Sequence, residues 1–428
     1  MAITEAVIYI SDGEYVEDQS VTSAVSGGKV TDTYATGIKV SSDEESLNGL
    51  YVTGDQSAYT LSNSEIDLSG NGSNDFDGTG AGAMANDGAT LVIKNVDITT
   101  NGCIRSAATV TGSSILKVYN STFTANGGTL PDDYVAKTGP GMMEPPSGLG
   151  ISGTCRCCLT MDNSKSYYYD STIISDGWGA LSTDSANGYV YMEANNCKVQ
   201  TVEDGYCAYA DNGCHDVFNN CQIDSAAMAI IMAGVSDAVY TDTEATCGTY
   251  FAMIHNVMGS TSEIATLTVN GGSIATDKAT FYVKSANADI IVDGAAITSD
   301  VLLQTIINDD SNRTVVPEGE TVYGINAVFK NMTLAGSVLH EDTERTTAVS
   351  LVATTLAGDI QDATITIDDD SKWTATADSV VTLGSASVDN IDAATGVTIT
   401  ATAGTDCTLS SGTYTLASGG SLVVSAAE

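Results

Sequence analysis

Two aspartates lie at equivalent points of a repeated pattern, and their residue type suits acid/base chemistry. The segment ALSTD ends at Asp184, and the segment CAYAD ends at Asp211, 27 residues later. Two carboxylates held close together do not both ionise at low cost, so one of them would supply a general acid beside a general base. Tyr209 and His215 lie close to Asp211 in sequence and could donate the complementary proton. We predict these four as catalytic residues.

The same two carboxylates are open to two other interpretations. A hard cation such as calcium prefers oxygen ligands of this kind, so calcium is the one cofactor that the pair suggests. Asp is also common where a strand passes into a turn, because its side chain caps backbone groups there. Catalysis, metal binding and turn formation therefore remain alternatives at this point.

Arginine and aromatic residues gather in the same part of the chain. Four of the five prolines lie in residues 126–154, and a segment so rich in Pro, Gly and Met cannot continue a regular strand pattern. Long excursions of this kind commonly form lids or binding loops. We therefore expect a groove lined by aromatic rings and arginines beneath this lid. The predicted substrate-binding residues are Arg105, Tyr134, Arg156, Tyr168, Trp178, Tyr206 and His255.

A repeated phrase must position these residues. It consists of alternating apolar residues, then Asn or Asp, then a small residue and a β-branched or aromatic one. Its copies end at Ile66, Ile98, Phe123, Ile173, Val199, Ile223, Ile274 and Ile297. Most gaps between these ends correspond to one or two units of about 25 residues, and such units bury a core only by stacking on one another. The pattern predicts an all-β solenoid, a parallel β-helix, in which equivalent residues of successive coils lie roughly 4.8 Å apart.

The Asn or Asp of the phrase is expected at a turn. These residues tolerate left-handed backbone angles, and their side chains bond neighbours along a stack. The position is occupied by Asn63, Asn95, Asn120, Asp170, Asn196, Asn220, Asn270, Asp293 and Asn331. The next position is small, as in Ser121 and Cys197, which predicts a crowded and buried corner.

Composition limits the partners of this protein. The 428 residues carry 54 acidic against 15 basic side chains, a formal charge of −39. This charge argues against nucleic acid and anionic membranes as partners and favours a small-molecule or glycan substrate that is neutral. No run of 18 apolar residues is present, and the first residues lack the basic and apolar regions of a secretory signal. We expect a cytoplasmic protein, with export open if a leader has been removed.

The ten cysteines match neither a zinc motif nor an obvious disulfide framework. Cys155, Cys157 and Cys158 crowd together, while Cys197 and Cys221 lie at equivalent repeat positions. We expect them to be small core residues in a reducing compartment.

In coil length, Asn ladder and strand pattern, residues 50–340 resemble the right-handed parallel β-helix group, which includes pectate-lyase-like enzymes, tailspikes and adhesins. The segment SDGWGALSTD is similar to uncharacterised bacterial β-helix sequences. We expect one domain, because each coil of a solenoid contacts only its neighbours. The resemblance implies that the solenoid is right-handed, and homo-oligomers such as trimers occur among such folds. We expect a cap and first coil in 1–50, the β-helix with its lid in 51–340, and Thr/Ser-rich coils with a cap in 341–428. The resemblance supplies no catalytic residues by motif.

Three functions remain open from the sequence. The first is an acid/base enzyme of the lyase, isomerase or hydrolase type, acting on a neutral polyhydroxylated, carbohydrate-like substrate. Its variant is an isomerase or transferase of a small hydroxylated aromatic held in a closed pocket. The other two lack turnover: a surface adhesin or structural solenoid, and a carbohydrate-binding module.

Overall fold

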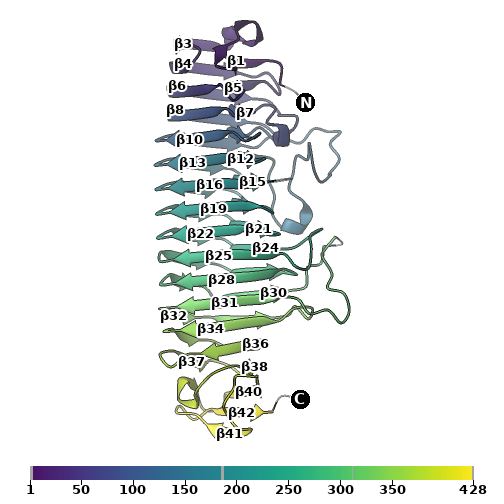
Figure 1. The fold of residues 1–428 in the computed structure, drawn as a ribbon, viewed down its shortest axis with the longest axis vertical. Helices are drawn as coiled ribbons and strands as arrows, with labels where there is room; N and C mark the ends of the chain where they lie inside the picture. The colour runs from purple at the N-terminus through teal and green to yellow at the C-terminus, as the bar shows by residue number, and fades with distance from the viewer. Residues whose placement is uncertain (1–2, 185–187, 311, 427–428) are drawn as a thin grey trace. The chain divides into compact units, whose positions relative to one another are not determined.

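The chain folds into two compact β-solenoid units, and each is described here by itself. The computed structural model describes residues 3–184, 188–310 and 312–426. Residues up to Ile230 form unit 1, and those from Ile231 onward form unit 2. The strand β21 (Met228–Ala233) contains the boundary. The predicted all-β parallel solenoid is confirmed, since strands within each unit pair mainly in parallel with strands one coil away (Figure 1).

Each regular coil of unit 1 contributes one strand to each of three rows. Row A contains β1 (Ala6–Ser11), β5 (Asn48–Thr53), β7 (Ala83–Asn86), β9 (Ala108–Val110), β12 (Arg156–Met161), β15 (Gly179–Asp184) and β18 (Tyr206–Ala210). Row B contains β10 (Ile115–Tyr119), β13 (Lys165–Tyr169), β16 (Val190–Asn195) and β19 (Cys214–Asn219). Row C contains β11 (Thr122–Asn126), β14 (Thr172–Ser175), β17 (Lys198–Thr201) and β20 (Gln222–Ser225). Three long strands, β4 (Tyr34–Ser42), β6 (Ala58–Ser69) and β8 (Thr90–Asn101), run through rows B and C without a break.

Short elements complete unit 1. They are β2 (Glu14–Tyr15), β3 (Val25–Val30), and the 3-10 helices η1 (Glu17–Gln19), η2 (Thr22–Ala24), η3 (Asp75–Asp77) and η4 (Ser147–Leu149). The pairs β1–β2 and β3–β4 are antiparallel, unlike the coils that follow. An antiparallel element at the end of a solenoid protects the terminal coil from pairing with another chain.

Unit 2 repeats the three-row pattern and then simplifies. Row A of unit 2 has β24 (Tyr250–His255), β27 (Ala279–Lys284), β30 (Val301–Ile306) and β33 (Ser337–His340). Row B has β22 (Asp237–Thr241), β25 (Ile264–Asn270), β28 (Asn287–Asp293), β31 (Ile325–Lys330) and β34 (Thr347–Val352). Row C has β23 (Glu244–Cys247), β26 (Ser273–Thr276) and β29 (Ala296–Thr298), followed by a separate sheet of β32 (Thr333–Ala335), β35 (Thr355–Ala357), β37 (Lys372–Ala375) and β39 (Ile391–Ala393). The last elements are β36 (Ile360–Ile367), β38 (Ser379–Leu383), η5 (Val388–Asn390), β40 (Thr398–Ala403), and the antiparallel pair β41 (Gly412–Thr415) and β42 (Ser421–Ser425).

The core of each unit consists of inward residues stacked coil upon coil. One such column in unit 1 runs through Leu61, Ile93, Val118, Tyr168, Ala194 and Phe218, all buried. Because side chains alternate across a strand, the neighbours of these residues point outward.

The predicted Asn turn is confirmed at most of its positions. Asn63, Asn95, Asn120, Asp170, Asn196, Asn220 and Asn331 all adopt positive φ, between 45° and 56°. Their amides also bond along the stack: Asn220 donates to Asn196 at 2.8 Å, and Asn196 donates to Asp170 at 3.2 Å. The prediction is wrong for Asn270 and Asp293, because the glycines that follow, Gly271 and Gly294, take the left-handed conformation instead at φ 67° and 69°. Glycine adopts such angles without steric cost.

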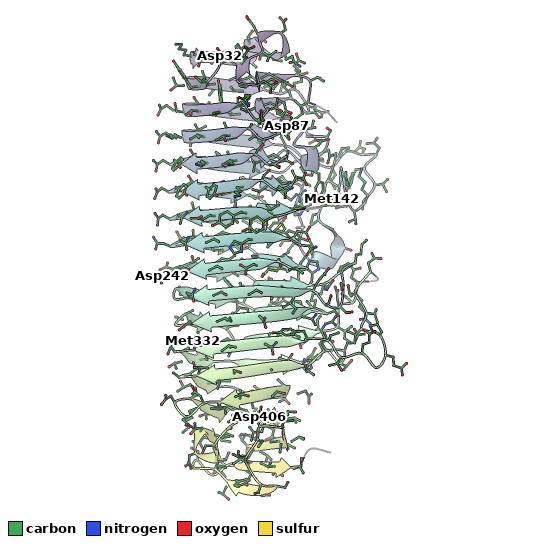
Figure 2. The ribbon with its side chains drawn as sticks, in the orientation of Figure 1. Asp32, Asp87, Met142, Asp242, Met332 and Asp406 are labelled. Atoms are coloured by element: carbon green, nitrogen blue, oxygen red, sulfur yellow. The ribbon has the colours of Figure 1, made fainter. Side chains whose placement is uncertain are left out.

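The Pro-rich segment 126–154 leaves the strand rows between β11 and β12 (Figures 1 and 2). Met142, labelled in Figure 2, lies on this projecting segment and is 7% exposed. Leu149 is also buried, and backbone NH groups of the segment donate to Asp176 and Asn74, which lie outside it. Among the described residues no cysteine forms a disulfide bond, and nine of the ten cysteines are buried. In the part of the chain that the structure describes, no helix is long and apolar enough to cross a membrane.

Candidate functional site

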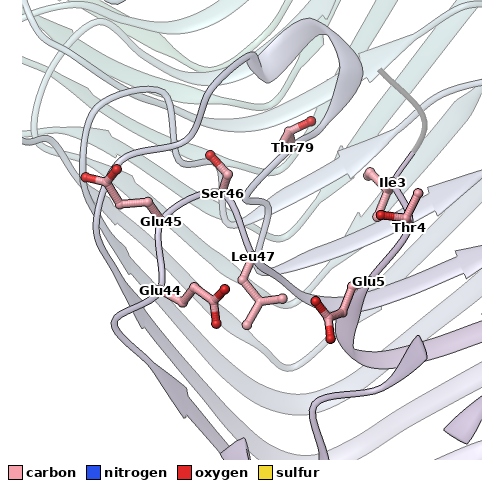
Figure 3. Close-up of a pocket in the computed structure, with 8 residues that line it drawn as sticks. All are labelled: Ile3, Thr4, Glu5, Glu44, Glu45, Ser46, Leu47 and Thr79. Atoms are coloured by element: carbon pink, nitrogen blue, oxygen red, sulfur yellow. The ribbon is translucent and has the colours of Figure 1, made fainter. Parts of the chain in front are cut away.

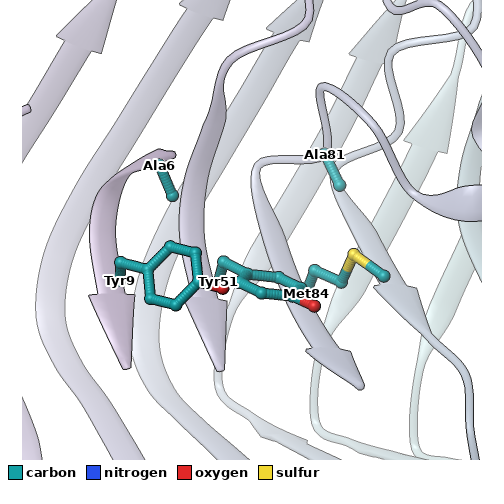
Figure 4. Close-up of a cluster of buried hydrophobic side chains, with 5 residues drawn as sticks. All are labelled: Ala6, Tyr9, Tyr51, Ala81 and Met84. Carbon is teal, nitrogen blue, oxygen red and sulfur yellow. The ribbon is translucent and has the colours of Figure 1, made fainter. Parts of the chain in front are cut away.

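The outward face of row A in unit 1 is covered, unlike an ordinary solenoid surface. Its central column runs through Tyr9, Tyr51, Met84, Thr109, Leu159, Ser182 and Tyr209. The first members pack together with Ala6 and Ala81 (Figure 4), and Ser182 is only 2% exposed. The segment 71–82 covers this column at Met84, since a side-chain atom added at Gly78 would lie 2.5 Å from the Met84 sulfur. Because this outward face is covered, polar side chains that lie on it are shielded from solvent.

Arg156 is the centre of a charged cluster on this face. It begins β12, is 2% exposed, and faces η3 of the covering segment. Its Nε donates to Asp75 Oδ2 at 2.9 Å, its Nη2 lies 2.9 Å from the same oxygen, and its Nη1 donates to Asp184 Oδ2 at 3.3 Å. The side chain of Asp75 is fully buried, whereas that of Asp184 is 21% exposed. The Arg156 cluster therefore reaches solvent through Asp184.

Two aromatic rings enclose the guanidinium of Arg156. Its carbon lies 4.5 Å from the ring centre of Phe76 and 5.0 Å from that of Trp178. Such cation–π contacts favour a cation that has been removed from water. Trp178 is buried and has a φ of 67°. Positive φ in a bulky residue is a strained conformation that the surrounding structure must impose, and such strain is concentrated at functional sites.

The lid fixes Trp178 from the other side. The Trp178 backbone NH donates to the carbonyl of Ser152 at 2.7 Å, and the Ser152 hydroxyl donates to Asp204 at 2.8 Å. Farther along the lid, the NH of Gly141 donates to Asn74 Oδ1, which also accepts from the NH of Phe76. The lid segment thus contacts both sides of the Arg156 cluster.

Tyr206 enters the cluster through a gap left by a glycine. Arg156, Gly179 and Tyr206 occupy the same position of three successive coils. A Cβ at Gly179 would lie 2.2 Å from the Tyr206 ring, so only glycine leaves room for the ring to lean toward Arg156. The Tyr206 hydroxyl is 2.9 Å from the Ser182 hydroxyl.

Burial and charge set the protonation of these groups. Burial raises the pKa of Asp75, although the adjacent Arg156 opposes this. Burial disfavours the charge of Arg156, but Asp75, Tyr206 and Asp184 together raise its pKa above the ordinary value. Burial raises the pKa of Tyr206 to about 12. At neutral pH the phenol is therefore protonated beside a permanent cation.

Asp184 and Asp211 lie on neighbouring coils, as the repeat predicts. Thr183 pairs with Ala210, so the two carboxylates follow at the next position, and the Asp211 NH donates to the Thr183 carbonyl at 3.2 Å. Burial, then the charges of Asp211 and Asp184, raise the pKa of Tyr209 well above its ordinary value. Tyr209 therefore stays protonated under the influence of these two carboxylates, and its ring lies 5.4 Å from that of Tyr206.

The structure places the other predicted site residues away from this cluster. Arg105 is fully buried and donates to the backbone carbonyls of Glu44, Ser69, Gly70 and Leu47. Tyr168 lies in the core column. Tyr134 lies within the lid, where its hydroxyl accepts from the NH of Met143. His215 stacks on Tyr191 of row B at 5.4 Å. His255 belongs to unit 2.

Asp75 and Phe76 are site residues that the sequence patterns did not identify. They lie in NGSNDFDGTG, an addition to the regular coil. The available signal was the spacing of 32 residues from Ile66 to Ile98, which exceeds the unit of about 25. A coil that is longer than the repeat unit has extra residues, and these can form a loop that covers the outward face of row A.

The described residues contain a pocket on the same unit but no metal cluster. The pocket has a volume of about 190 Å³ and is lined by residues that include Glu5, Glu44, Glu45, Leu47 and Thr79 (Figure 3). The Arg105 side chain supports its wall through the carbonyls of Glu44 and Leu47. Within 3–184, 188–310 and 312–426, no group of three or more His, Cys, Asp or Glu side chains is placed to hold a metal ion. Neither a scan of protein-family models nor a search of curated proteins gives a match for this chain.

Proposed function

We propose that this protein is an acid/base enzyme of the lyase, isomerase or hydrolase type that acts on a neutral, polyhydroxylated, carbohydrate-like substrate. The observation that carries the proposal is the Arg156 cluster: a buried guanidinium between two carboxylates, of which only Asp184 reaches solvent. Burying such charges costs several kcal/mol per ion unless they are well paired. Arrangements of this kind are concentrated at functional sites.

The residues have distinct roles in this proposal. Asp184, oriented by Arg156, accepts a proton from the substrate as general base. Tyr209 remains protonated beside Asp184 and Asp211 and acts as general acid; because its pKa is raised, it protonates a strongly basic oxygen such as a leaving alkoxide. Asp75 balances the charge of Arg156, and Trp178 and Phe76 hold the guanidinium in place. The summed charge of Arg156, Asp75 and Asp184 is negative, which favours a neutral hydroxylated substrate over an anionic one.

We further propose that the chain is related to the right-handed, pectate-lyase-like parallel β-helix group. The three strand rows, the Asn ladder and the long excursion between β11 and β12 support this relationship.

A small hydroxylated aromatic is the second candidate substrate. The close covering of the row A face favours it, because Arg156, Leu159 and Met161 are all at most 3% exposed. A site enclosed in this way suits a compact ligand better than a polymer.

The test compares two isosteric substitutions, Asp184→Asn and Asp170→Asn, on a panel of neutral glycans and hydroxylated aromatics. Asp170 is an exposed turn residue with a φ of 50°, a conformation that Asn also tolerates. We expect Asp184→Asn to lower turnover by about 10²-fold or more, with an unchanged thermal midpoint. Asp170→Asn should retain full turnover.

Three results would contradict the proposal or alter it. If the full panel shows no turnover, the protein is a scaffold or a binding module. If Asp184→Asn and Asp170→Asn changed turnover equally, Asp184 would have no specific role in the mechanism. Loss of turnover on adding EDTA, with recovery on adding calcium, would favour a cation held by Asp184 and Asp211.

A further inference from the structure

A second set of buried polar groups lies in unit 2, on the outward face of row A. His255 ends β24 and Lys284 ends β27, and the two are direct partners in the parallel pairing. Ile254 and Val283 are core residues, so alternation turns His255 and Lys284 outward. Both are nevertheless buried, at 9% and 8% exposed. Neighbouring parallel strands lie roughly 4.8 Å apart, so the two side chains project side by side.

The long connection between β30 and β31 covers these side chains. Arg313 forms an antiparallel bridge with Val257, and the NH of Met258 donates to the carbonyl of Asn312 at 3.0 Å. Closer to β30, the NH of Asn308 donates to the Ser285 hydroxyl at 2.8 Å. The connection is thus anchored just beyond the ends of both β24 and β27.

His255 has an unused hydrogen-bonding atom in this enclosed place. Its Nε2 is buried and has no hydrogen-bond partner among the described residues. Burial and the charge of Lys284 lower the pKa of His255 to about 4, so the ring is neutral at physiological pH. A buried polar atom without a partner is costly and calls for an explanation such as a ligand.

Lys284 brings a positive charge to the same place. Its Nζ lies 3.8 Å from Asp309 Oδ1, and the side chain of Asp309 is 92% exposed. A loose pair with an exposed partner stabilises little, so another carboxylate could compete with Asp309. Tyr282 lies two residues before Lys284 on the same face, and burial raises its pKa to about 12. It therefore presents a hydroxyl rather than a phenolate.

We propose that His255 and Lys284, with Tyr282 beside them, form a binding site for the carboxylate group of a small molecule. The Lys284 ammonium pairs with one carboxylate oxygen, and the His255 ring donates an N–H to the other. A monoanion fits better than a phosphate dianion, because Asp309 and Asp310 lie close by. The inference is independent of the function proposed for the Arg156 cluster, since it uses only residues of unit 2.

The test uses acetate as the probe and the full chain labelled with ¹⁵N-histidine. The three histidines report separately by NMR, so His215 and His340 serve as internal controls. We expect acetate to shift the His255 ring resonances saturably and to leave the other two unchanged. Lys284→Met should abolish saturation, whereas Lys330→Met, which removes a lysine elsewhere in unit 2, should not. Asp309→Asn should tighten acetate binding several-fold, because it removes the competing carboxylate.

The outcomes that overturn the proposal are equally definite. They are a His255 shift that does not saturate, parallel shifts of all three histidines, and saturation that persists in Lys284→Met. Asp309 is exposed, so Asp309→Asn should fold even if Lys284→Met does not. Unchanged or weaker acetate binding in Asp309→Asn would by itself refute the competition on which the site depends.

Discussion

At the scale of single residues, the two carboxylates of the Arg156 cluster differ: Asp75 is structural and Asp184 is proposed to be functional. Asp75 is buried and contacts Arg156 through two nitrogens, whereas Asp184 contacts it through one and is partly exposed. Asp75 should therefore contribute mainly to stability and Asp184 mainly to chemistry. This division gives the two carboxylates different mutational signatures.

Asp75→Asn should lower the free energy of unfolding by about 3 kcal/mol, because it leaves a buried arginine charge poorly compensated. Urea denaturation measures the change. The control is Glu65→Gln, which removes the exposed ion pair between Lys39 and Glu65 and should leave the free energy of unfolding nearly unchanged. Similar losses for the two variants would show that the Arg156–Asp75 pair is not a buried pair in solution.

His255 should make unit 2 sensitive to acid. Its folded pKa of about 4 lies below the ordinary 6.5, so between these values the unfolded chain binds more protons than the folded one. The contribution of His255 to the free energy of unfolding is therefore complete above about pH 6.5. It decreases as the pH drops, by about 3 kcal/mol in total by pH 4. His255→Gln should reduce this loss in denaturation measured across the range. An identical pH dependence in wild type and His255→Gln would contradict the burial of the neutral ring.

At the scale of the elements, strand alternation and turn chemistry explain most of what the sequence could predict. The repeated Asn predicted turns with left-handed backbone angles, and the 27-residue spacing placed Asp184 and Asp211 on neighbouring coils. Arg105 and Tyr168 were assigned to a groove, yet one donates to backbone carbonyls and the other lies in the core. Their residue types suggested chemistry, but only the local alternation of the strand decides which way a side chain points.

The cluster itself depends on contacts that no repeat encodes. Asp75 reaches Arg156 across 81 positions of sequence, through a segment added to one coil. The register of the coils predicts which strands are neighbours, but it does not predict how an irregular segment folds back over them.

Asn196 offers a test of the turn ladder. With φ at 54°, its backbone favours Asn or Gly over Ala, and its side chain bonds Asp170 and Asn220. Both Asn196→Gly and Asn196→Ala lose these hydrogen bonds, but only alanine adds the left-handed backbone penalty of about 1–2 kcal/mol. Asn196→Ala should therefore be less stable than Asn196→Gly by about 1 kcal/mol in urea denaturation. The opposite order would show that the turn does not hold this conformation.

At the scale of the whole molecule, the formal charge of −39 governs solution behaviour more than any single ion pair. Self-repulsion among so many carboxylates destabilises a compact state, and salt screens it. The thermal midpoint should therefore rise by a few degrees between about 0.01 M and about 1 M NaCl. A midpoint that falls with salt would mean that attractive ion pairs outweigh the repulsion.

The account depends most on the coupling of Arg156 and Asp184 in catalysis, and a double-mutant cycle measures it. The kcat/KM of wild type, Arg156→Lys, Asp184→Asn and the double variant would be compared on a substrate found in the panel. Because Arg156 is proposed to act by orienting Asp184, the double variant should lose no more activity than Asp184→Asn alone. Losses that multiply, or variants that keep full activity, would contradict the assignment of the Arg156 cluster as the active site.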